Sequence, residues 1–149
     1  MTKHSTQQQS MSTDSSASAT STIVETVRLN RAARDQLITL KRRTGIENWN
    51  VLCRWALCVS LAEPTRPRDV KLDGDGGVEM AWRTFTGGDD LIYATLIRQR
   101  CTNDDVPLSS ESLAQQLKLH LHRGIAYLVG SPKLRDVTGL IGMADASNR

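Results

Sequence analysis

Three cysteines and two neighbouring histidines are the residues whose types could support chemistry. Cys53, Cys58 and Cys101 form no CxxC pair, and a zinc site needs about four grouped Cys or His ligands. Cys53 and Cys58 are five residues apart, which on a helix places them on different faces, and no activating base is evident beside them. We therefore interpret the cysteines as structural thiols within a predicted core, in a reducing, cytoplasmic setting.

The histidines His120 and His122 are two residues apart, so they point to different sides of a helix. A shared metal ion favours the i, i+4 spacing. We interpret His120, three residues after Leu117 and at the border of an apolar stripe, as a core or interface histidine. Arg123 beside it is a candidate subunit or DNA contact.

A glycine-rich acidic run at residues 73–77, DGDGG, is partly similar to a calcium loop. An EF-hand also needs a ligand at loop position 5 and Glu at position 12, where this chain has Gly77 and Thr84. No P-loop, nucleophile with its base, or clustered pair of catalytic carboxylates is present either. The sequence thus predicts no catalytic residue, no metal and no cofactor, and a protein that is not an enzyme.

The strongest functional signal is a cluster of cations opposed only by Asp35. Clustered cations are typical of phosphate binding, and no comparable cluster occurs later in the chain. Residues 23–72 carry ten Lys and Arg against five Asp and Glu, whereas residues 73–111 carry three against eight, within a net charge of +3. This charge asymmetry could steer DNA to one face, or the basic part of one subunit could bind the acidic part of another. The predicted DNA-binding residues are Arg28, Arg31, Arg34, Lys41, Arg42 and Arg43.

A strand and two helices are predicted to carry these cations. Residues 23–29 alternate as a β-strand does. Asn30 can cap a helix that ends at Gly45 as its left-handed terminator, with an apolar stripe of Ala33, Leu37 and Leu40. Asn48 can cap a second helix stopped by Pro64 and Pro67, and its predicted buried face consists of Leu52, Trp55, Ala56 and Val59.

The second half of the chain predicts a loop, a strand and two more helices. The loop spans residues 71–77, and a short strand follows at 78–85. The helix at 89–101 begins with two aspartates, and its predicted apolar side comprises Leu91, Tyr93, Ala94, Leu96 and Ile97. The clearest helix spans 109–129, with the apolar stripe Leu113, Leu117, Leu121, Gly124, Ile125 and Leu128.

The whole chain of 149 residues has room for one domain with tails. Residues 1–22 are rich in Ser, Thr and Gln and predict a disordered tail, residues 23–131 form the DNA-binding domain, and residues 132–149 form a C-terminal tail. The expected fold is mainly α, a small single domain of about four helices with a short N-terminal strand and one further strand. No apolar stretch resembles a signal peptide or a membrane helix. A strand followed by two helices is the order of ribbon-helix-helix DNA binders.

The amino-acid sequence of three segments resembles that of the DndE family of DNA sulfur-modification proteins. These are RLNRAARDQLITLKRRTGIENWNVLCRWALCVSLAEP, LIRQRC and LKLHLHRGIAYLVG, and the resemblance covers roughly residues 23–131. It implies a largely helical homotetramer that binds double-stranded DNA, favours nicked duplex, and works beside the DndC and DndD components. Their bacterial system replaces a non-bridging phosphate oxygen of DNA by sulfur. The family's DNA surface is attributed to lysines, whereas the basic segment of this chain is mostly arginine.

Two other functions stay open at this point. One is a scaffold that binds DndC or DndD and leaves DNA contacts to the assembled complex. The weaker one is a nicking enzyme that uses Asp or Glu with a divalent metal.

Overall fold

The computed structural model describes residues 20–72, 76–131, 139 and 141–142, and its first regular element is the strand β1 (Thr26–Leu29). Val27 and Leu29 are buried while Arg28 is exposed, as the predicted alternation requires. The helix α2 (Arg31–Thr44) follows directly. The Asn30 side chain accepts a hydrogen bond from the Ala33 amide at 2.8 Å. The predicted cap is therefore confirmed.

The rest of α2 also matches the prediction. Ala33, Leu37 and Leu40 are buried, and Gly45 terminates the helix with φ 72°. Its amide donates to the Lys41 carbonyl at 2.9 Å. A residue with a side chain is strained at this positive φ, so glycine suits the position.

The partner of β1 is β2 (Val78–Ala81), which runs antiparallel to it with Thr26 opposite Ala81 and Leu29 opposite Val78. In ribbon-helix-helix proteins the strand pairs between two subunits, so the pairing within one chain differs from that arrangement. The predicted strand over 78–85 is too long: residues after Ala81 form the short helix α4 (Trp82–Thr86). Trp82 and Phe85 are three residues apart, and a helical turn brings both rings into the core at 5.5 Å from each other.

The helix α3 (Trp49–Ala62) starts where predicted, but its buried face is rotated. Leu52 and Ala56 are buried as expected, whereas Trp55 and Val59 are only half-buried. Asn48 occupies the cap position without a side-chain hydrogen bond. The face is wider than one stripe because both α4 and α6 pack on α3, and this brings Cys53, Leu57 and Ser60 into the core.

The helix α5 (Asp90–Asn103) buries Ala94 and Ile97 as predicted. Leu91 and Leu96, which the sequence placed on the apolar side, are 55% and 41% exposed. Arg100 is buried instead because its guanidinium donates hydrogen bonds to backbone carbonyls at the end of α3 and just after it. Sequence periodicity does not show such a contact.

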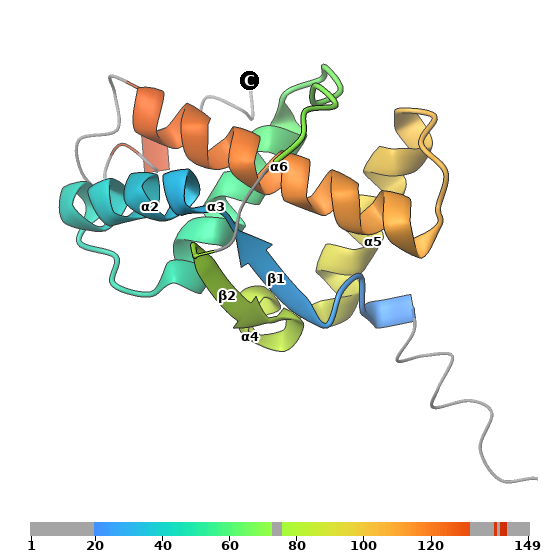
Figure 1. The fold of residues 1–149 in the computed structure, drawn as a ribbon, viewed down its shortest axis with the longest axis horizontal. Helices are drawn as coiled ribbons and strands as arrows, with labels where there is room; N and C mark the ends of the chain where they lie inside the picture. Colours follow the sequence, from blue (N-terminus) through green and yellow to red (C-terminus); the bar gives the residue numbers. More distant parts are fainter. Residues whose placement is uncertain (1–19, 73–75, 132–138, 140, 143–149) are drawn as a thin grey trace, which may run out of the picture.

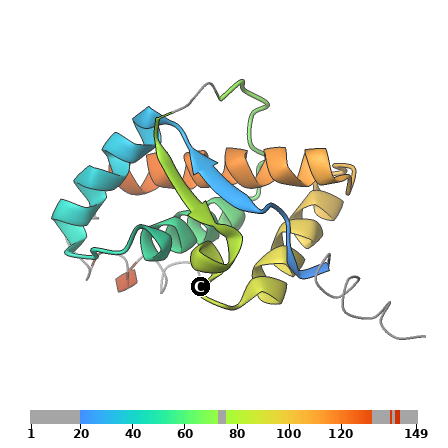
Figure 2. The same cartoon turned by 60° about the horizontal axis from the view of Figure 1, so that its bottom comes forward.

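The helix α6 (Ser110–Gly130) runs across the molecule, with α2, α3 and α5 arranged along it (Figure 1). Ser109 caps it by accepting from the Ser112 amide at 3.2 Å. Every residue of the predicted stripe is buried. Figure 2 shows β1 and β2 beside this helix, with α2 and α5 at opposite ends of the molecule. The fold is mainly helical with a short antiparallel sheet, as the sequence predicts.

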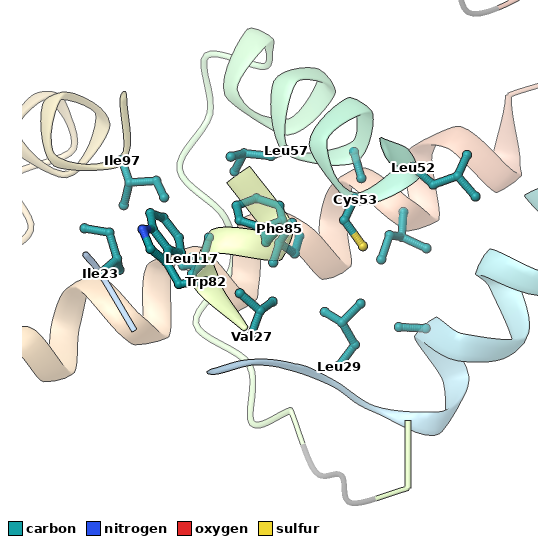
Figure 3. Packing of buried hydrophobic residues seen from close by; sticks show 14 of the residues in the cluster. Ile23, Val27, Leu29, Leu52, Cys53, Leu57, Trp82, Phe85, Ile97 and Leu117 are labelled. Atoms are coloured by element: carbon teal, nitrogen blue, oxygen red, sulfur yellow. The ribbon is translucent and has the colours of Figure 1, made fainter. Parts of the chain in front are cut away.

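A single core joins the sheet to the helices. Figure 3 shows Val27 and Leu29 of β1 facing Phe85 of α4, with Leu57 of α3 and Leu117 of α6 nearby. The loop prediction at residues 73–75 and most of both predicted tails lie outside the described residues. Within residues 20–22, the Ser21 carbonyl accepts a hydrogen bond from the Trp82 indole at 2.7 Å.

The two long core helices α3 and α6 approach closely at Gly124, where a Cβ atom would lie 1.8 Å from the Ala56 carbonyl oxygen. We predict that Gly124→Ala lowers the free energy of unfolding by about 2 to 4 kcal/mol, because α3 and α6 would have to separate. Urea unfolding followed by circular dichroism measures this. Gly130→Ala is the matched control on the same helix, since nothing lies within 4 Å of its Cβ position. Equal stability of the two variants would contradict the prediction.

Candidate nucleic-acid interface

Three of the six predicted cations lie on the outer side of α2. Arg31, Arg34 and Arg42 are exposed, and none of their guanidinium groups makes a hydrogen bond or ion pair with another described residue. Helical periodicity places Asp35 and Ile38 between them, and Ile38 is 46% exposed. This side of the helix, with Arg31, Arg34 and Arg42, is called the α2 face below.

The other three cations are engaged by the protein itself. Arg28 forms an ion pair with Glu79 across the sheet at 3.4 Å, with both side chains about two-thirds exposed, and such surface pairs are weak. The Lys41 ammonium lies 5.3 Å from the centroid of the Trp49 ring. The Arg43 guanidinium donates to the Val129 carbonyl of α6 at 2.9 Å. The predicted set is thus divided between a free surface and internal contacts.

A pocket of about 490 Å³ opens beside Arg34, between α2, β2 and the start of α3. Glu47 and Glu79 line it together with Arg34 and Trp49. Two carboxylates against one guanidinium do not favour an anion, so this pocket does not extend the phosphate-binding surface of α2.

The sequence found no second cationic cluster, but the structure brings one together. Arg66 and Arg68, in the segment after α3, line a second pocket with Arg123 of α6. The string RPR at 66–68 was the available signal, and it was missed because Arg123 is distant in sequence. His122 lines the same pocket, and its Nε2 accepts from the Asn30 amide at 3.3 Å. The pocket therefore adjoins the start of α2.

A buried polar network lies between this pocket and the core. The Ser60 hydroxyl and His120 Nδ1 are 2.8 Å apart, and the Arg123 Nε donates to the same hydroxyl at 2.8 Å. A Ser and His pair can be nucleophile and base, but these two residues are 0% and 1% exposed, so no substrate reaches them. The prediction of a core histidine is confirmed for His120.

Both histidines are held neutral by their surroundings. Burial, together with the nearby Arg123 and Arg100, lowers the pKa of His120 to about 4 against the opposing effect of Asp104. Burial also lowers the pKa of His122, whose Nδ1 bonds to the Lys118 carbonyl at 2.7 Å. Among the described residues, no three His, Cys, Asp or Glu side chains are grouped as metal ligands would be.

The cysteines divide into two environments. Cys53 and Cys101 are buried, whereas Cys58 is exposed, so its predicted place in the core is wrong. Burial raises the pKa of Cys53 to about 12. Desolvation also raises the pKa of Cys58, against the opposing effect of Arg54. The thiolate form that reacts is therefore disfavoured at both positions on α3.

Comparison with models of known protein families gives a match. The model of a family described as DNA sulphur modification protein DndE matches residues 26–136, which is more than half of the chain. No curated protein matches. No helix in the part of the chain that the structure describes has the length and hydropathy to cross a bilayer.

We predict that acid destabilises the fold through His120. Its pKa is lower in the folded state than the ordinary 6.5, so the unfolded chain binds more protons as the pH falls from about 6.5 to about 4. The free energy of unfolding should fall over that window by up to about 3 kcal/mol from this residue. Urea titrations at pH 7 and pH 4.5 measure the drop. His120→Gln should show a smaller drop than the parent, and equal drops would contradict the assignment.

Proposed function

The chain belongs to the DndE family of DNA sulphur modification proteins, and on that basis we propose that it is the DNA-binding, non-catalytic subunit of that system. Family membership establishes involvement in DNA sulphur modification. The proposed binding surface is the α2 face. The observation that carries the proposal is its three exposed guanidinium groups, each without a partner among the described residues.

The α2 face suits a phosphate backbone in its dimensions. With a rise of about 1.5 Å per residue, Arg31 and Arg42 are separated by roughly 16 Å along the helix axis. A DNA strand advances about 3.4 Å per nucleotide, so the two cations span about five nucleotides. Arginine can bind phosphate oxygens in a bidentate manner. Asn and Gln side chains for base edges are scarce here, so we expect backbone binding without sequence readout.

One copy offers few phosphate contacts, and we propose that a homotetramer multiplies them. Linked binding sites gain avidity from a high effective concentration. The outer side of α5 supports contact between copies: Leu91, Ile92 and Leu96 are each more than 40% exposed. Large exposed apolar side chains that lie together favour a protein interface. The preference for nicked duplex belongs to the same proposal.

The same side of α5 favours a second candidate function. A scaffold that binds DndC or DndD would need an apolar surface away from the basic one, and α5 and α2 lie at opposite ends of the molecule (Figure 2). In that case the isolated protein would not bind DNA, and the α2 face would act only within the assembled complex.

We predict that Arg42→Glu weakens duplex binding at least tenfold at about 0.1 M salt and reduces the salt slope by about one, because one phosphate contact is lost. Gel-shift titration of intact and singly nicked duplex of identical sequence, at several salt concentrations with chelator, measures this. Arg43 is avoided because its bond to the Val129 carbonyl would confound the result.

The control variant carries Arg83→Glu at an exposed position of α4, away from the α2 face and from the outer side of α5, which changes the net charge by the same two units as Arg42→Glu. It should bind as the parent does. Equal weakening in both variants would show that only total charge matters. Absence of binding by the parent protein at low salt would favour the scaffold.

A further inference from the structure

The second pocket has a volume of about 420 Å³ and lies between the segment after α3 and the outer side of α6. Its rim carries Arg66 and Arg68, and its apolar lining includes Val70, Leu72 and Tyr127. No carboxylate is among its lining residues. It therefore combines a cationic rim with an apolar wall, in contrast to the mixed-charge pocket beside Arg34.

The segment that forms this pocket is fixed at its start by the buried guanidinium of Arg100 and the half-buried guanidinium of Arg123. Arg100 donates to the carbonyls of Leu61, Glu63 and Thr65, each at 2.8 Å. Arg123 donates to the same Thr65 carbonyl at 2.7 Å and to the Ser60 carbonyl at 2.7 Å. Because Thr65 is held from two helices, the residues that follow it are positioned against α6.

The two rim cations are free to bind a ligand. Arg66 and Arg68 are exposed, and neither guanidinium group makes a hydrogen bond or ion pair with another described residue. Arg123, by contrast, already donates through Nε and both terminal nitrogens. The anion-binding capacity of the pocket thus resides in Arg66 and Arg68.

The apolar wall carries an oriented aromatic ring. Tyr127 is 42% exposed, and the Arg123 guanidinium lies 5.8 Å from its ring centroid. This cation–π contact, made by a guanidinium that is itself fixed by hydrogen bonds, holds the ring in place. Val70, which is 46% exposed, adds apolar surface nearby. A flat ligand can stack on such a surface.

We infer that this pocket binds an unpaired nucleotide of a DNA strand, with the base against Tyr127 and Val70 and its phosphate against Arg66 and Arg68. Aromatic stacking with adjacent cations is how proteins hold single strands without reading sequence. A base within an intact duplex is stacked inside the helix and cannot enter. The inference rests on the proposed DNA binding, and it gives the difference between nicked and intact duplex a physical origin.

The position of the pocket next to the start of α2 supports its use together with the α2 face. His122 lines the pocket and accepts from the backbone amide of Asn30, the cap of α2. Arg31 is the next residue along the chain. A duplex on the α2 face would thus have its strand end within reach of Arg66 and Arg68.

The test uses 5′-phosphorylated tetrathymidylate with a 3′ fluorescent label, and its binding to the full chain is measured by fluorescence anisotropy. Tyr127→Ala should weaken binding about tenfold, whereas Tyr127→Phe should stay within about twofold of the parent. Arg66→Glu with Arg68→Glu should weaken binding more than tenfold and flatten its salt dependence. Arg42→Glu should leave tetrathymidylate binding within about twofold while it weakens intact duplex.

Each arm separates this inference from the proposed α2 surface. Tetrathymidylate binding that is lost in the pocket variants supports the nucleotide pocket even if intact duplex does not bind. Absence of tetrathymidylate binding by the parent protein, or equal binding by Tyr127→Ala and the parent, overturns it. Competition with inorganic phosphate distinguishes a nucleotide site from a site that binds the phosphate group alone. Full competition by phosphate, together with unchanged binding by Tyr127→Ala, would also overturn the nucleotide assignment.

Discussion

The rest of the structure depends on the close contact of α3 and α6 at Gly124. With no side chain at this position, the backbone of α6 comes so near to α3 that a Cβ atom would overlap the Ala56 carbonyl. Four residues further along α3, the same approach brings Ser60 within 2.8 Å of His120 Nδ1. A wider separation would leave these polar groups buried without each other, which is costly in an apolar interior. Packing and polar pairing therefore depend on the same glycine.

The packing of α3 on α6 also divides the cations of this chain into those used for internal hydrogen bonds and those left exposed. Arg100 and Arg123 use their guanidiniums to satisfy carbonyls at the end of α3 and in the segment beyond it. They hold the backbone in place and have little left for a ligand. The Arg43 guanidinium likewise donates a hydrogen bond to a backbone carbonyl, that of Val129. Charge is available to a phosphate only where the fold provides no internal acceptor, and the α2 face and the rim at Arg66 and Arg68 meet that condition.

Elements whose signals lie close together in the sequence could be predicted. The cap at Asn30, the terminator at Gly45 and the stripe of α6 depend on residues within one or two turns, and each was found from the sequence. The errors concern long-range contacts. Leu96 was placed in the core because apolar spacing cannot show that Arg100 would be buried in its stead. The basic pocket was missed for the same reason, since Arg66 and Arg123 meet only after α3 and α6 have packed.

The arrangement of the surfaces has a consequence for how one molecule would engage DNA and protein together. The α2 face and the nucleotide pocket adjoin through the contact of Asn30 with His122, so both can act on one strand. The exposed apolar side of α5 lies at the far end of the fold (Figure 1), and its outward residues from Leu91 to Leu96 include no charge. A surface that meets its own copy across a twofold axis avoids repulsion when it is uncharged. Assembly through α5 would therefore leave the α2 face open, and each added copy would contribute its own α2 face to DNA binding.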